Sequence, residues 1–272
     1  MFSIKNNLMA DNAARHLGSS YQSLATSIER LSSGLRINSA KDDAAGLAVR
    51  ELMRADIAVV RQGARNAADG ISMLQTMEGA MGTIDEALIR MKELAEQAST
   101  DSYSETQRNI MNNEFQQMVS EITRIANKTE FNSIMMLNSA SGTNTIHFGV
   151  GSSIDVNSVD VRAATLTGST TAAISGTDGT RARLALALVN SAIETKDSAR
   201  ASLGYMMNRL QSTNQVLNIQ AENLLAAESR ISDVDVATEM AKMTRNQVLT
   251  QAGIAMLGQA NGMPQMALSL LR

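Results

Sequence analysis

Apolar residues recur at helical spacing along four long segments of the chain. In the first segment the steps alternate between four and three residues, through Leu17, Tyr21, Leu24, Ile28, Leu31 and Leu35. A second stripe runs through about 43–97, a third through 111–125, and a fourth repeats every seven residues from Leu203 to Ile231. A 3.5-residue repeat is typical of helices that pack nearly parallel or antiparallel. The pattern therefore predicts a mainly α protein with a long, coiled-coil-like helical rod.

The segment from Asn138 to Gly179 has a different pattern and is rich in Ser, Thr, Gly, Asn and Asp. Residues 143–148 and 153–156 alternate polar with apolar side chains around a turn at 149–151. Such alternation is typical of short strands joined by a turn. We therefore expect a small β-hairpin region at about 138–180, at the far end of the rod, with helix resuming near Arg181. This order pairs the N- and C-terminal helices.

Turn and capping residues indicate where the first helices end and begin. Gly34 and Asn38 interrupt the first helix, and either Asp42 or Asp43 is placed to cap the second. Asp is a favourable cap because its carboxylate accepts hydrogen bonds from the free N–H groups of the first turn.

The last helix has start signals of its own. Either Ser232 or Asp233 is placed to cap it, with Ile231 and Val236 as a hydrophobic staple. The sequence thus predicts four parts: a terminal helix in 1–42, a rod segment in 43–180 that contains the β region, a returning rod helix in 181–230, and a terminal helix in 231–272.

Composition narrows the classes of function. The chain has 272 residues, one proline, no Cys and a formal net charge of −3. Scarce proline suits long helices, and a negative charge gives no general attraction for nucleic acid. The two histidines, His16 and His147, lie far apart in the sequence, and no phosphate-binding or metal-ligand motif appears. We therefore predict no enzymatic activity, no cofactor and no metal site.

Both ends of the chain contain long uncharged stretches. No Asp, Glu, Lys or Arg occurs in 16–28 or in 246–271, although an ordinary surface helix carries charges on its solvated face. Several Gln and Asn residues interrupt the second stretch, so it does not have the composition of a membrane span. We therefore expect both ends to pack closely against protein, including further copies of the chain.

The first residues, Met1–Leu8, contain no apolar run of the kind found in secretory signal peptides. Taken alone, this feature predicts a cytoplasmic protein.

Several motifs resemble those of bacterial flagellins. Residues 30–49 (RLSSGLRINSAKDDAAGLAV) are similar to the N-terminal signature of that family, and 66–75 (NAADGISMLQ) to the helix that continues into its rod. Phe131-Asn132 and 148–151 resemble the link into its β region, and 226–235 and 268–272 its C-terminal signature. The resemblance covers nearly the whole chain. With only about 40 residues between Asn138 and Arg181, we expect a short form without large variable outer domains.

The resemblance implies a structural subunit that polymerises into the bacterial flagellar filament for motility. Flagellins are exported unfolded through a type III apparatus, without a cleaved signal peptide, and assemble outside the cell at the filament tip. Residues 1–42 and 231–272 would then form an inner tube, and 43–230 a rod domain. The implied partners are further copies of the chain, an export chaperone, and cap and junction proteins. No nucleic acid and no membrane insertion are expected.

The resemblance also singles out two sets of residues. The expected self-assembly residues are apolar positions of the terminal helices: Leu17, Leu24, Ile28, Leu31, Leu35, Ile231, Val236, Ile254, Leu257, Leu268 and Leu271. The pattern by which some flagellins are detected by host Toll-like receptor 5 falls on Arg90, Leu94 and Glu114. Arg90 and Leu94 are four residues apart and so share a helix face.

Two other functions stay open. A hook–filament junction protein of the same superfamily shares the helical ends but forms a short adaptor ring. A cytoplasmic helical signalling rod also has heptads and little proline, but it would leave the uncharged final stretch and the β region without a role.

Overall fold

The structure is a computed structural model that describes residues 7–138, 142–149, 151–167, 173–177 and 179–269. These residues fall into two compact units, one built from Met1–Ile57 with Glu222–Arg272 and the other from Ala58–Ala221. The two boundaries fall inside long helices, α2 (Ala44–Ser99) and α5 (Thr180–Ser232).

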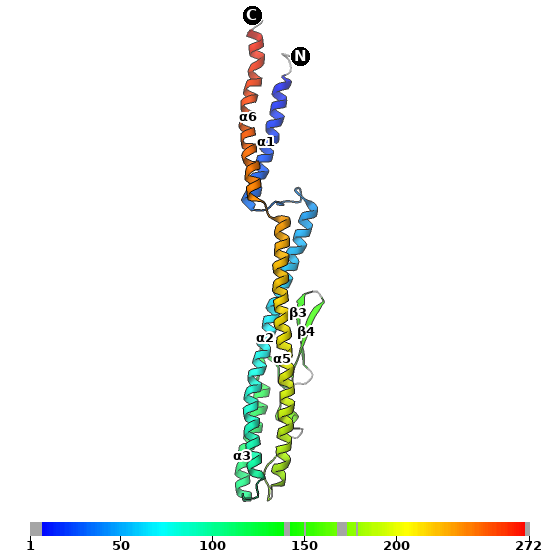
Figure 1. Cartoon of the computed structure of the whole chain (residues 1–272), viewed down its shortest axis with the longest axis vertical. Coiled ribbons are helices and arrows are strands. Elements are labelled where there is room, and N and C mark those ends of the chain that lie inside the picture. Colours follow the sequence, from blue (N-terminus) through cyan, green and yellow to red (C-terminus); the bar gives the residue numbers. More distant parts are fainter. Residues whose placement is uncertain (1–6, 139–141, 150, 168–172, 178, 270–272) are drawn as a thin grey trace. The chain divides into compact units, whose positions relative to one another are not determined.

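In the first unit, α1 (Leu8–Ser33) and α6 (Val236–Ser269) run side by side in opposite directions (Figure 1). Near one end of the pair, the Asn7 amide donates a hydrogen bond to the Ala260 carbonyl at 2.8 Å. Further along, Gly253 lies so close to Leu17 that an added Cβ would be 3.1 Å from the Leu17 Cδ1. The expected pairing of the terminal helices is therefore confirmed.

The end of α1 and the start of α2 have the expected capping residues. Gly34 ends α1 in the left-handed conformation, with φ of 73°, and its N–H donates to the Arg30 carbonyl. Asp43 caps α2, because its carboxylate accepts the Gly46 N–H at 2.9 Å. Asp42 instead accepts the N–H groups of Asn38 and Ser39 and so holds the turn before the helix.

The expected cap of α6 was wrong. The helix is capped by Asp235, whose carboxylate accepts the Ala237 N–H at 3.0 Å and the Thr238 hydroxyl at 2.7 Å. Ser232 is the last residue of α5, and the N–H of Asp233 still donates to the Ser229 carbonyl. The expected hydrophobic staple between Ile231 and Val236 was also wrong. Val236 is the first residue of the helix and is 54% exposed.

The second unit contains most of α2 and α5 together with α3 (Glu105–Lys128), which lie along one another (Figure 1). Ion pairs join Asp85 of α2 to Lys196 of α5 and Arg90 of α2 to Glu114 of α3. The core between them consists of fully buried side chains of all three helices, among them Met77, Met81, Leu88, Met91, Phe115, Ile122, Leu203 and Leu210. The predicted seven-residue repeat of α5 is therefore a core-facing stripe in this unit.

The β region forms two strand pairs. The predicted hairpin is present as β3 (Thr143–Gly149) and β4 (Ser152–Asn157), which pair antiparallel. A second pair, β1 (Glu130–Phe131) with β2 (Ile134–Met135), and a single-turn helix, α4 (Ala163–Leu166), were not expected from the sequence.

The hairpin does not lie at the far end of the rod, where the sequence placed it. It contacts the first part of α2 within that unit, since Asn66 donates to the His147 carbonyl and Gly63 lies against the Phe148 carbonyl. The opposite end is formed by the turn between α2 and α3, which follows Ser99 and ends at Ser104, the capping-box residue of α3. The β region thus flanks the helices instead of forming a tip between an outgoing and a returning helix.

Candidate functional site

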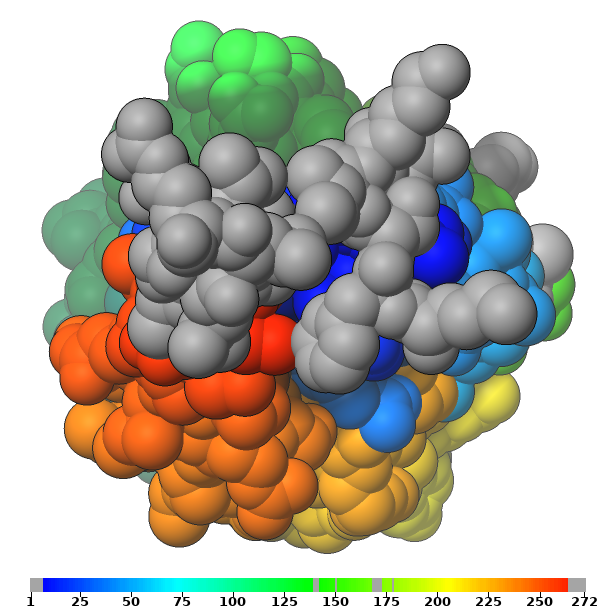
Figure 2. Space-filling view, turned by 90° about the horizontal axis from the view of Figure 1, so that it is seen from above, coloured from blue at the N-terminus to red at the C-terminus, as the bar shows by residue number. Residues whose placement is uncertain are grey.

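The α1–α6 pair exposes many large apolar side chains. They are Leu8, Met9, Tyr21 and Ile28 on α1, and Val236, Met240, Val248, Leu249, Ile254 and Met256 on α6, with exposures from 48% to 67%. Apolar residues of α6 are spread around the helix, whereas those of α1 gather on one side. A helix that is apolar all round is normally surrounded by protein. In the described structure, α1 lies along one side of α6 (Figure 1). Figure 2 shows part of α6, in dark orange, on the outside of the molecule.

The residues expected to drive self-assembly divide into three groups. Leu17, Leu24, Leu31, Leu35, Ile231 and Leu257 are half-buried within the unit, whereas Ile28, Val236 and Ile254 are exposed. The Leu268 side chain and Leu271 lie outside the described residues. The half-buried group already packs inside one chain, so the exposed group, with the other exposed residues named above, is what a neighbouring molecule could contact.

A buried carboxylate joins the two terminal helices. Glu239 of α6 is 3% exposed, accepts a hydrogen bond from the Ser27 hydroxyl of α1 at 2.7 Å and pairs with the Lys242 ammonium at 3.1 Å. The Ser27 hydrogen bond and the Lys242 ammonium hold the pKa of this carboxyl below its usual range. Sequence reasoning missed the pair, because its one local signal is a Glu three residues before a Lys.

The two charged residues of the expected receptor contact lie together on the surface of the second unit. The Arg90 guanidinium donates to the Glu114 carboxylate at 2.8 Å and to Glu93 at 2.9 Å, and the pairing raises the pKa of Arg90 above its usual value. Arg90 and Glu114 are each about half exposed. Leu94 is 2% exposed, so it belongs to the core beneath the pair and not to the surface.

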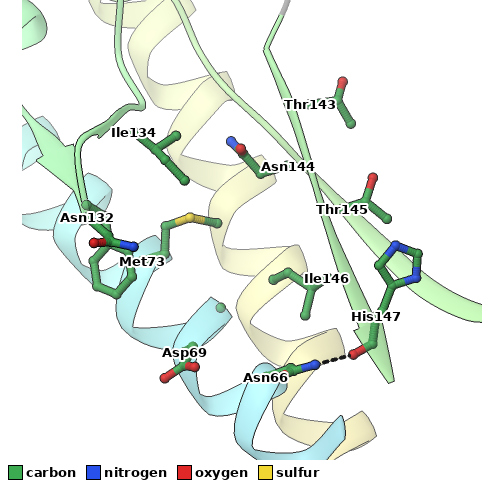
Figure 3. Close-up of a pocket in the computed structure, with 12 residues that line it drawn as sticks. Asn66, Asp69, Met73, Asn132, Ile134, Thr143, Asn144, Thr145, Ile146 and His147 are labelled. Atoms are coloured by element: carbon green, nitrogen blue, oxygen red, sulfur yellow. Dashed lines mark hydrogen bonds between the residues drawn. The ribbon is translucent and has the colours of Figure 1, made fainter. Parts of the chain in front are cut away.

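A cleft of about 440 Å³ lies between α2, the β1–β2 turn and β3 (Figure 3). Met73 and Ile146 supply apolar walls, Asp69 and Asn132 stand at its edge, and the Asn66–His147 hydrogen bond closes one end. Among the residues that the structure describes, no group of three or more His, Cys, Asp or Glu side chains is arranged to hold a metal ion. Within the same residues, no helix is long and apolar enough to cross a membrane.

Comparison with known proteins identifies the family. The pattern described as "Bacterial flagellin N-terminal helical region" matches residues 4–143, and that described as "Bacterial flagellin C-terminal helical region" matches 186–271. A flagellin from Halalkalibacterium halodurans is 44% identical over 273 residues, which cover 99% of both chains. The chain belongs to the bacterial flagellin family.

Further relatives and a solved structure agree with this assignment. The flagellar filament 33 kDa core protein of Treponema phagedenis is 41% identical over 285 residues, again covering 99% of both chains. The crystal structure of Bacillus cereus flagellin superimposes with a TM-score of 0.51 at 29% identity, covering 60% of this chain and 94% of that one. The predicted mainly α flagellin fold and the short form of the chain are thus confirmed.

Proposed function

We propose that this chain polymerises into a bacterial flagellar filament by packing its exposed α1–α6 surface against further copies. The filament role follows from the family, whose full-length relatives are named flagellin and filament core protein. It replaces the junction protein and the signalling rod that the sequence left open. The observation that supports this particular surface is the set of exposed apolar side chains on α1 and α6, which among the described residues pack mainly against each other.

The energies favour contact with several neighbours at once. Covering a large, half-exposed apolar side chain stabilises an assembly by about 1 kcal/mol, so the ten exposed residues of α1 and α6 contribute on the order of 10 kcal/mol. Association costs about 4–15 kcal/mol in lost translational and rotational entropy. One small contact would therefore be marginal, and the surface is better suited to a polymer in which each copy has many neighbours.

The uncharged stretches suggest where each part lies in the polymer. We assign residues 1–42 and 231–272 to an inner tube and 43–230 to a rod domain around it, as the family resemblance implies. Residues 246–271 carry no charge that would need water or a counter-ion, which supports their burial inside the tube. We also propose that a type III apparatus exports the chain unfolded with the help of a chaperone. Cap and junction proteins would then lie at the two ends of the filament.

Seeded growth tests the proposal. Purified protein is added to short filament fragments and examined by electron microscopy, alongside a variant that ends at Arg245. We expect long filaments from the complete chain and none from the shortened one, because the variant lacks most of the exposed apolar residues of α6. Growth of the shortened chain at the normal rate would contradict the proposal, and rings in place of filaments would favour the junction protein.

Recognition by a host receptor is a second proposed function, and the exposed Arg90–Glu114 pair supports it. Arg presents a planar fork of donors that can bind a partner's carboxylate or carbonyl groups. We expect Arg90→Ala to weaken binding of monomers to the Toll-like receptor 5 ectodomain by about tenfold or more, as loss of an interface arginine commonly does.

The matched control is Arg124→Ala, because Arg124 is also exposed and pairs with a glutamate, Glu121, on α3. Surface plasmon resonance with both variants gives the comparison. If the two variants bind equally well, Arg90 has no part in recognition.

A further inference from the structure

A positively charged pocket lies between the two terminal helices. Its volume is about 420 Å³, and its ionisable lining groups are Arg30 of α1 and Glu239, Lys242 and Arg245 of α6. Three cations thus face one carboxylate, in a chain whose overall formal charge is −3. The pocket marks the point at which charges stop, because no Asp, Glu, Lys or Arg follows Arg245 until Arg272.

The cations of this pocket are incompletely paired within the chain. The Arg30 Nε is buried and has no hydrogen-bond partner among the described residues. The terminal nitrogen of the same guanidinium is 3.8 Å from the Asp42 carboxylate, which is too long for a hydrogen bond. The Glu239 carboxylate accepts hydrogen bonds from both the Lys242 ammonium and the Ser27 hydroxyl. In the described part of the chain, Arg245 forms no ion pair with a carboxylate.

Covering this pocket would be costly unless an anion comes with the covering molecule. A buried charge without a partner costs several kcal/mol, and the pocket has an excess of two positive charges over Glu239 alone. The α1–α6 surface around it is the one that further copies are proposed to cover. Each copy brings 27 Asp and Glu side chains against 24 Lys and Arg, so a neighbouring copy can supply the missing negative charge.

We propose that this pocket binds a carboxylate of a second copy of the chain, which fits between Arg30, Lys242 and Arg245 and fixes the register of neighbouring subunits. The inference rests on the proposed filament assembly and adds the polar contact that orients it. Apolar side chains pack with little directional preference, whereas a carboxylate held by arginine and lysine donors fits in one position and orientation.

Charge reversal at the edge of the pocket is the first test. Arg245→Glu turns an attractive site into a repulsive one for a carboxylate, and Lys41→Glu makes the same change of charge in the exposed loop before α2. We expect Arg245→Glu to slow seeded filament growth by at least about tenfold relative to Lys41→Glu, since like charges across an interface cost several kcal/mol. Arg245→Gln should fall between them. Equal growth of the two charge-reversed variants would overturn the proposal.

Zero-length cross-linking is the second test. A carbodiimide joins an ammonium to a carboxylate that already contacts it, so filaments grown from mixed isotope-labelled and unlabelled chains reveal bonds between copies by mass spectrometry. We expect a bond from Lys242 to an Asp or Glu of another copy. Bonds confined to Glu239 of the same chain would overturn the proposal.

Two further results have distinct meanings. If the unchanged chain fails to grow on seeds, the proposed function fails and takes this inference with it. A second result would be that the unchanged chain grows only when sulfate is added to a chloride buffer and that no cross-link between copies forms. The pocket then binds a free oxyanion, and the proposed role of the second copy is overturned.

Discussion

Arg108 is a buried cation that ties together one end of the second unit. The residue is 1% exposed. Its guanidinium donates to the carbonyl groups of Ala98 at 3.1 Å, Thr100 at 3.0 Å and Thr177 at 2.9 Å. These carbonyls belong to the end of α2 and to the loop before α5, so one side chain holds both against the start of α3.

Replacing Arg108 should therefore be costly. Arg108→Ala leaves three inward-facing carbonyls without donors, and we expect it to lower the free energy of unfolding by about 3 kcal/mol. Arg108→Lys should recover part of the loss, because an ammonium lacks the planar fork that reaches all three oxygens. Urea unfolding followed by circular dichroism gives the values. Arg124→Ala, which removes an exposed arginine, should change them by less than about 0.5 kcal/mol, and a similar loss for both variants would refute the role of Arg108.

Glu239 makes the pairing of α1 and α6 dependent on pH. Its pKa lies below the usual value because the Ser27 hydroxyl and the Lys242 ammonium stabilise the charged form. A carboxyl with a pKa lowered by folding stabilises the folded state above its unfolded pKa of about 4.3. The contribution is lost as the pH falls through the lower, folded value.

We expect Glu239→Gln to lower the melting temperature of assembled filaments at pH 7 and to have a diminishing effect as the pH falls below about 4. Melting followed by light scattering from pH 7 to pH 3 measures this difference. Glu86→Gln, at an exposed position of α2, serves as the control and should show little change at any pH. A difference for Glu239→Gln that stays constant with pH would show that ionisation of this carboxyl is not its cause.

At the scale of elements, a glycine in α2 sets the contact between the helix and the β3–β4 hairpin. A Cβ on Gly63 would be 2.5 Å from the Phe148 carbonyl oxygen, which is shorter than van der Waals contact allows. Gly79 of the same helix has open space at that position. The first glycine therefore serves the packing of the hairpin, and the second has no such role in the described structure.

The two substitutions should have opposite signs. Gly79→Ala should stabilise the protein by about 0.5–1 kcal/mol, since alanine is the better helix former. Gly63→Ala should destabilise it by about 1–3 kcal/mol, because the hairpin must move away from the helix. Thermal unfolding of both variants decides the matter, and stabilisation by Gly63→Ala would mean that the hairpin does not depend on this close approach.

The features that sequence analysis predicted are those fixed by nearby residues. Helical periodicity and the caps at Gly34 and Asp43 depend on side chains within a few positions, and both were found. The two-residue strands β1 and β2 have too little sequence to show a pattern. The binding of Arg108 to Thr177, 69 residues away, is a consequence of tertiary packing.

The receptor and assembly residues show the same limit. Leu94 shares a helix face with Arg90 by spacing but is buried, because α2 is contacted by both α3 and α5 and so has more than one covered side. Similarly, most of the expected assembly residues are half-buried between α1 and α6, while the further exposed residues Val248, Leu249 and Met256 became evident only once the partner helix was in place.

For the whole molecule, the terminal helices combine two properties that seldom occur together in a protein that acts alone. They expose large apolar side chains over much of their surface, and their stretches 16–28 and 246–271 carry no charge that would keep such a surface soluble. Packing by further copies removes the exposed apolar area, and the pocket of Arg30, Lys242 and Arg245 provides the polar contact that orients it.

The most direct test of this account is the accessibility of α6 before and after assembly. The chain has no cysteine, so Val248→Cys and Ile254→Cys each introduce one thiol at a position that is exposed in the single chain. The control is Thr145→Cys on the exposed side of the hairpin. We predict that a maleimide labels all three monomers rapidly, that filaments protect positions 248 and 254, and that position 145 stays reactive. Equal labelling of positions 248 and 254 in monomers and filaments would contradict the proposed assembly surface.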